Sequence, residues 1–266
     1  MPLSRLADWY VLAELNALVE ETDLTHQQIA TEVGVSSRTI TNYLSGETRP
    51  KAGMAASLAK ACGGTEKRAN FLSHVIKQLD SGGIVSDLSQ RNIFIVERAE
   101  ATSGEFWKWE PWYIPGPLQI ERYHFEKLPE ASANPMQNWQ RQHRRFLTIG
   151  SRRPLPVMKF LTSTNALRQL SNWEWAERQF NHLLKIDRWP NCEIRIVDGL
   201  HQGIDHSFEI FLPAGRAEAA PPFVYVEALD QSRHVEEPEK ISLYHDRCKG
   251  MWSVGSRIGG HLDDWI

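Results

Sequence analysis

The sequence predicts an α + α/β protein in which an N-terminal bundle of five helices precedes a larger α/β domain with a mixed sheet. Apolar residues recur at helical spacing through residues 5–79. A stretch rich in glycine, serine and aspartate follows at residues 80–90. Beyond it, β-rich runs alternate with helical patterns, and all of the 10 tryptophans except Trp9 lie there. The expected divisions are a domain at 1–80, a linker at 81–90, a domain at 91–258 and a tail at 259–266.

Bulk properties limit the classes of protein to consider. The chain has 266 residues and a formal net charge of -3, as an ordinary folded protein of one or two domains does. No apolar run reaches the roughly 18 residues that span a bilayer, and the first residues lack a signal-peptide core. Cys62, Cys192 and Cys248 show no CxxC spacing, which favours free buried thiols over a redox sensor. We therefore expect a cytoplasmic protein with no membrane partner.

The first helices are predicted from apolar spacing and capping residues. Apolar side chains indicate an amphipathic helix over about residues 5–21. Thr25 is placed to cap the next helix, and Gln28, three residues on, completes a capping box. Gly34 follows where the chain has to turn with a positive φ, which glycine adopts without strain. Ser36 then caps a second helix.

That second helix is predicted to carry polar side chains on its outer face. It runs to about Leu44, with Ile40 turned inward and Gly46 just after its end. Pro50 suits the first turn of a further helix, and another is expected over about residues 65–79. The residues expected to face outward from the short helix are Ser37, Arg38, Thr41 and Asn42.

Residues 24–50 therefore show the pattern of a helix-turn-helix, in which the second helix enters the DNA major groove. All four outward-facing residues are expected to reach base edges. Arg38 is expected to pair with guanine and Asn42 with adenine. His26, Arg49 and Lys51 are expected to lie near phosphates, where they set the position of the protein rather than its sequence preference.

Residues 5–79 resemble the Cro/C1-type (XRE-like) helix-turn-helix family, whose domain has five helices. The small, glycine and apolar positions fall in register with that family. Two positions depart from it: His26 stands where the family often has glutamine, and Leu44 stands where it often has an acidic residue. The resemblance implies binding to double-stranded DNA.

An aromatic cluster opens the second domain. Trp107, Trp109, Trp112 and Tyr113 follow Phe106 within eight positions. Three interpretations remain open: buried core, a groove for a ligand or peptide, and a contact surface for another protein. Pro115 and Gly116 predict a turn, after which Pro117 is expected to start a helix bearing Leu118, Ile120 and Tyr123.

The rest of this domain is predicted to hold a mixed sheet. β-rich runs occupy residues 157–162, 193–198, 207–212 and 223–227. An amphipathic helix over residues 173–186 separates the first two runs, which indicates a βαβ unit. Leu243, Cys248 and Trp252 indicate another helix near the end. We expect a sheet of four or more strands.

The order of short motifs in this domain is similar to that of an actinobacterial family. Leu118 and Gln119 follow the turn, and Arg141 and Gln142, residues 166–168 and a helix at 179–184 come next. The strands at NCEIRIV, FEIFL and FVYVE complete the order. Residues 85–258 resemble the C-terminal domain of WhiJ-like helix-turn-helix regulators. The resemblance implies an antitoxin-like regulator commonly encoded beside a small partner protein, with no catalytic residues.

Two further features leave alternatives open. His201 and His206 flank a loop between strands and are interpreted as ligand-binding or polar loop residues, because their spacing matches no metal-ligand pattern. A basic run is either a solvated helix face or a contact to flanking DNA or an acidic partner. Its residues are Arg141, Arg144, Arg145, Arg152 and Arg153.

The leading hypothesis is a sequence-specific transcriptional regulator that binds DNA as a homodimer, on half-sites about one helical turn apart. Its second domain would receive a signal, most readily from a small protein encoded nearby. The second hypothesis is an antitoxin-like neutraliser or scaffold for that protein, with DNA binding for autoregulation. The third is an enzyme fused to a DNA anchor. We expect no enzyme activity, no cofactor and no metal.

Overall fold

A computed structural model describes residues 5–82, 93–127, 134–198, 206–227 and 232–260. The chain divides into two compact units, and the division falls between Arg98 and Ala99. The linker expected at residues 81–90 lies almost entirely outside the described residues, as do His201 and most of the expected tail. No helix within the described ranges is both long and apolar enough to cross a membrane.

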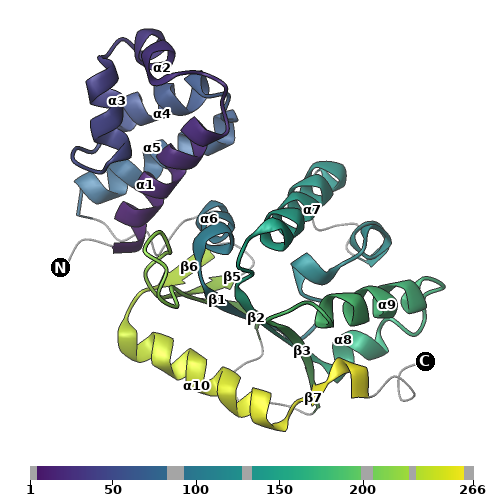
Figure 1. The fold of residues 1–266 in the computed structure, drawn as a ribbon. Coiled ribbons are helices and arrows are strands. Elements are labelled where there is room, and N and C mark those ends of the chain that lie inside the picture. The colour runs from purple at the N-terminus through teal and green to yellow at the C-terminus, as the bar shows by residue number, and fades with distance from the viewer. Residues whose placement is uncertain (1–4, 83–92, 128–133, 199–205, 228–231, 261–266) are drawn as a thin grey trace. The chain divides into compact units, whose positions relative to one another are not determined.

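The first unit contains the predicted bundle of five helices (Figure 1). The helices are α1 (Arg5–Glu20), α2 (His26–Val33), α3 (Ser37–Leu44), α4 (Ala52–Ala61) and α5 (Glu66–Asp80). Their shared core includes Leu15, Ile29, Ile40, Leu58 and Leu72, all at most 1% exposed. A sixth helix, α6 (Phe94–Thr102), was not predicted and crosses the division between the units.

Pro50 occupies a different position from the one predicted. Helix α4 begins at Ala52 with Lys51 as its N-cap, so Pro50 lies just before the cap rather than in the first turn. Its side chain is buried. The fixed φ of proline therefore directs the chain into the helix from outside it.

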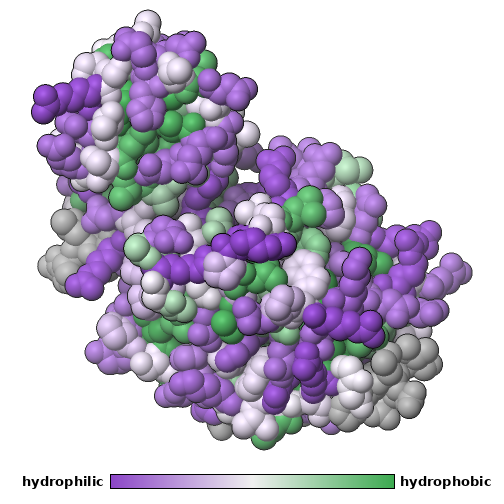
Figure 2. Space-filling view, viewed as in Figure 1, coloured by the Kyte–Doolittle hydropathy of each residue, from purple (hydrophilic) through white to green (hydrophobic). Residues whose placement is uncertain are grey.

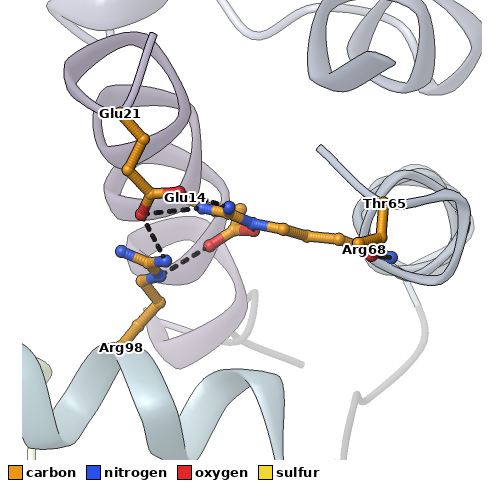
Figure 3. Close-up of polar contacts among 5 residues, drawn as sticks. All are labelled: Glu14, Glu21, Thr65, Arg68 and Arg98. Atoms are coloured by element: carbon orange, nitrogen blue, oxygen red, sulfur yellow. Dashed lines mark hydrogen bonds and ion pairs between the residues drawn. The ribbon is translucent and has the colours of Figure 1, made fainter. Parts of the chain in front are cut away.

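Buried ion pairs connect α6 to the bundle (Figure 3). The carboxylate of Glu14, on α1, accepts from Nε of Arg68 on α5 and lies 2.7 Å from Nε of Arg98 on α6. Both guanidinium groups also reach Glu21. Burial alone would raise the pKa of Glu21, but the hydrogen bonds and charges of Arg68 and Arg98 lower it. The cluster therefore holds three helices of this unit together.

The second unit is built on a mixed sheet of seven strands in the order β6-β5-β4-β1-β2-β3-β7. β1, β2 and β3 are parallel, and every other pairing is antiparallel. The strands are β1 (Glu105–Glu110), β2 (Val157–Ser163), β3 (Cys192–Val197), β4 (Phe208–Leu212), β5 (Phe223–Glu227), β6 (Ser232–Val235) and β7 (Ser256–Arg257). This confirms the predicted α/β domain and its βαβ unit.

Helices cover both faces of the sheet (Figure 1). Helix α10 (Pro238–Val254) packs on one face, where Trp107 and Phe208 belong to the apolar core. Helices α6, α7 (Pro135–Ser151) and α9 (Ala176–Asp187) lie on the other face. There Lys108, in the middle of β1, donates to Glu100 of α6 at 2.6 Å. The charge of Lys108 is thereby balanced inside the domain.

Several local predictions need correction. Pro117 does not start a regular α-helix: a 3-10 turn covers Gly116–Leu118, and Tyr123–Lys127 forms one π-helical turn. Helix α9 begins at Ala176 rather than Trp173, after the short helix α8 (Thr164–Arg168). β1, β6 and β7 were not predicted as strands.

Candidate nucleic-acid interface

The turn between α2 and α3 has the predicted local structure. Thr25 accepts from the amide of Gln28, and the Gln28 side chain accepts from the amide of Thr25, which completes the capping box. Gly34 adopts φ 73° and ψ 35°, in the left-handed region. Ser36 then accepts from the amide of Thr39 at 3.1 Å. Because each step is fixed by a side chain or by glycine, α3 leaves the turn in a defined direction.

Helix α3 is attached to the bundle through a small part of its surface. Ile40 is its one buried residue. At its C-terminal end, Nδ2 of Asn16 on α1 donates to the carbonyl of Leu44 at 3.0 Å and to that of Leu12 at 2.9 Å. Asn16 thus donates to a carbonyl that has no hydrogen-bond partner within the helix. Every other residue of α3 is exposed or half-buried.

The four predicted base-reading residues lie together on this surface. Arg38 and Thr41 are exposed, and Ser37 and Asn42 are half-buried. The hydroxyl of Ser37 donates to Gln27 of α2, and that of Thr41 donates to the carbonyl of Ser37 at 3.1 Å. The amide nitrogen of Asn42, once oriented toward acceptors, reaches Glu47 at 3.2 Å. These contacts fix the polar groups around Arg38.

The three predicted phosphate-contacting residues differ in their surroundings. His26 is the first residue of α2 and Lys51 is the N-cap of α4, and both side chains are exposed. Helix N-termini favour anions, so these two positions fit phosphate contacts. Arg49 instead lies 2.9 Å from Asp8 and 2.9 Å from Asp80. Its charge is compensated by both carboxylates, which links the loop to α1 and α5.

The aromatic cluster of the second unit is divided between core and surface. Trp107 and Trp109 are only 2% and 4% exposed, because alternate residues of β1 point into the core under α10. These two are core residues rather than contact residues. Trp112 and Tyr113, beyond the end of the strand, are 48% and 41% exposed. Only this pair is placed to contact another molecule.

Hydrogen bonds fix the segment that carries the exposed pair. Thr162 Oγ1, on β2, donates to the carbonyls of Glu110 and Tyr113 at 3.1 and 3.2 Å. The carboxylate of Glu110 accepts from the amide of Trp112 at 3.2 Å. Burial raises the pKa of this carboxyl to about 7, although the backbone donors act in the opposite direction. His206 is exposed and lies two residues before β4.

This segment lies at the edge where the parallel strands end, the usual location of binding sites in open α/β sheets. In the described part of the chain, no three histidine, cysteine or acidic side chains are grouped so that they could hold a metal ion. Cys62, Cys192 and Cys248 are free and buried.

Some residues of the interface were missed by sequence reasoning. Asn16, Gln27 and Glu47 each contact α3 or its end from another segment. The capping preferences that predict α3 give no information on such contacts, because they concern only the neighbours of each helix end, whereas Asn16 is 28 residues from Leu44 and Gln27 is 10 residues from Ser37. The sequence gives only a weak indication of the contact made by Gln27. Gln27 lies on α2, the helix that precedes the turn into α3.

Comparison with known families divides the chain in the same way as the fold. A family model described as a helix-turn-helix domain matches residues 12–71. A second, described as a domain of unknown function (DUF5753), matches residues 96–257. No curated protein and no solved structure matches the chain. The helix-turn-helix predicted from the capping residues and Gly34 is therefore confirmed.

Proposed function

We propose that the chain, which belongs to the DUF5753 family and carries a helix-turn-helix domain, is a sequence-specific DNA-binding regulator of transcription. The observation that carries this proposal is the exposure of α3, which is attached through Ile40 and its two ends. A helix held in this way can enter the major groove with its polar face intact. The Cro/C1-type resemblance of the first unit supports the same function.

The reading of bases is assigned to the outer face of α3. Arg38 can donate two hydrogen bonds to guanine, and Asn42 can pair with adenine if its amide leaves Glu47. Thr41 and Ser37 supply hydroxyl groups for further base contacts. His26 and Lys51 contact phosphates on either side, and Arg49 keeps the loop in place for them.

The test compares base-reading and control variants on an operator selected from a random DNA library. Arg38→Ala combined with Asn42→Ala is expected to reduce discrimination for the operator by about tenfold to a hundredfold for each contact, as measured by fluorescence anisotropy. Lys67→Ala combined with Asn70→Ala likewise removes one cation and one asparagine, at exposed positions on α5. Unchanged discrimination in the first variant, or an equal loss in the control, would contradict the assignment.

A homodimer is the assembly that fits this function. Two copies of α3 would then read half-sites about one helical turn apart, and the operator would be close to palindromic. Sedimentation of the DNA complex should show two chains on one operator. A single chain on an asymmetric site would exclude the dimer and leave the reading helix unaffected.

For the DUF5753 unit we propose a binding role rather than catalysis. Trp112 and Tyr113 form an exposed aromatic pair on a segment that Thr162 holds in place. Such pairs are frequent at protein contacts. A small protein encoded nearby is the proposed partner, in keeping with the WhiJ-like resemblance, and an antitoxin-like role is the second candidate. Trp112→Ala with Tyr113→Ala should abolish co-purification of that protein and leave operator binding unchanged.

A further inference from the structure

The chain separates its charges strongly along the sequence. Between Glu130 and Glu174 there is no acidic residue, whereas the chain as a whole has a formal net charge of -3. This segment includes the whole of α7. Its basic residues are Arg141, Arg144, Arg145, Arg152, Arg153, Lys159 and Arg168. A separation of this kind concentrates positive potential on one part of the second unit.

Part of this positive charge has a structural use. Arg145 lies 2.7 Å from Glu100 through both Nε and Nη2. Arg152 donates to the backbone carbonyls of Glu100 and Ser103, each at 2.7 Å. These two residues hold α7 and the following turn against α6. They are unavailable for a further ligand, which corrects the view of the basic run as one continuous face.

A second set of basic side chains forms a surface with α7. Arg178, His182 and Lys185 are spaced i, i+4 and i+7 on α9, so they lie along one face of that helix. Arg178 and Lys185 are exposed, and His182 is half-buried. Trp139, His143 and Phe146 have the same spacing on α7. We call these six residues the α7–α9 surface.

Ring contacts join the two halves of this surface. The rings of Phe146 and His182 are 5.8 Å apart, and Phe146 stacks on Trp189 at 5.2 Å. Trp139 stacks on His143 at 5.5 Å. The rings therefore contact one another, with Trp139 and Phe146 half-buried and His143 exposed. Hydrophilic residues cover much of the surface over α7 and α9 (Figure 2).

The cations of this surface have no acidic partner within the described residues. No ion pair of Arg178 or Lys185 occurs there, and both groups are exposed. Burial lowers the pKa of His182, and the nearby charges of Lys185 and His143 lower it further. Lys185, His143 and a protonated His182 thus repel one another. An anion placed against them would relieve this repulsion.

We propose that the α7–α9 surface binds phosphates of the DNA that flanks the site read by α3. This inference rests on the proposed DNA-binding function. Arg178 and Lys185 are two exposed cations on one face of α9, and exposed cations of this kind make the non-specific contacts of proteins with the DNA backbone. An acidic peptide would also need a recess for its apolar anchors, whereas the exposed side chains of α9 are all polar or charged.

The test measures the salt dependence of DNA binding by the full chain. The probe is a duplex that carries the selected operator with flanks of about two helical turns on each side. Each phosphate contact contributes about 0.9 to the slope of log affinity against log salt. Arg178→Gln combined with Lys185→Gln should therefore lower the slope by about 1.8. On a duplex trimmed to the operator, wild type and variant should have equal slopes.

The matched control is Lys240→Gln combined with Arg247→Gln, which removes the same two charge types from exposed positions on α10. Its slope should equal that of the wild type. An unchanged slope for the α9 variant, or an equal fall in the control, would overturn the proposal. So would binding of a poly-glutamate peptide that the α9 substitutions abolish while the DNA slope stays unchanged. If the wild type selects no operator at all, the proposed DNA-binding function is wrong. That result differs from an unchanged salt slope, which contradicts only the role of the α7–α9 surface.

Discussion

The Nε atom of Arg98, on α6, lies 2.7 Å from the carboxylate of Glu14, a residue of α1 that is only 1% exposed. The same carboxylate accepts from Arg68 on α5. One buried acid thus holds two guanidinium groups from different helices. The helix-turn-helix bundle depends on this acid, because loss of one partner leaves buried charge without compensation.

Glu14→Gln is therefore expected to lower the free energy of unfolding of the first unit by about 3 kcal/mol. The measurement is urea unfolding followed by circular dichroism. Glu66→Gln serves as the control, because Glu66 forms a long, exposed ion pair with Lys60, 4.0 Å apart. The control should change stability by less than about 0.5 kcal/mol. Equal effects of the two substitutions would show that the buried cluster has no special role.

Ile40→Ala tests the attachment of α3. Ile40 is fully buried, and its truncation should destabilise the first unit by about 3 kcal/mol. Operator affinity should fall further than the loss of folded protein explains, because α3 would no longer be held in one orientation. Thr41→Ala, at the next position and exposed, should leave stability nearly unchanged. Stability can be followed by thermal unfolding and affinity by anisotropy.

Gly34→Ala tests the turn. The φ of Gly34 is 73°, and an added Cβ would meet no atom within 4 Å, so the expected effect is conformational strain alone. This strain should destabilise the unit by about 1 kcal/mol. Gly53→Ala on α4 also meets no atom within 4 Å but needs no positive φ. That substitution should stabilise by up to about 1 kcal/mol. Opposite signs in chemical denaturation are the expected result.

Glu110 predicts a dependence of stability on pH. Burial raises the pKa of its carboxyl from an ordinary 4.5 to about 7 in the folded chain. The folded state then binds the proton more tightly than the unfolded state, so stability falls as pH rises from about 4.5 to 7. Glu110→Gln should remove this loss and be the more stable protein at pH 8, by up to about 3 kcal/mol.

The matched control for this pH experiment is Glu121→Gln, at an exposed position of the same unit. The difference in unfolding free energy between it and the wild type should be the same at pH 5 and pH 8. A difference between Glu110→Gln and the wild type that stays constant across this range would disprove the raised pKa.

The first unit could be predicted closely because its determinants are local. Thr25, Gly34 and Ser36 fix the ends of α2 and α3 through neighbours in sequence. The outward face of α3 follows directly from those ends. The role of Arg49 could not be predicted, since Asp8 and Asp80 are 41 and 31 residues away.

The second unit was harder to predict because long-range contacts decide it. β1 carries Lys108 at its centre, which is unusual for a strand buried on both faces. Its charge is compensated by Glu100 and Glu209, which are 8 and 101 residues away in sequence. Likewise, the aromatic cluster contains both core and surface residues, and sequence alone does not reveal where the strand ends. β1 ends at Glu110, so Trp112 and Tyr113 lie beyond the strand and are exposed.

The position of β1 in the sheet has a consequence for synthesis on the ribosome. β1 pairs with β2 on one side and with β4, which begins at Phe208, on the other. The nascent strand must therefore wait for roughly a hundred residues to emerge before its second edge is covered. The N-terminal bundle is complete long before that point. We expect the bundle to fold first. The tryptophans of β1 then stay uncovered until β4 is synthesised, and we expect chaperones to bind that segment.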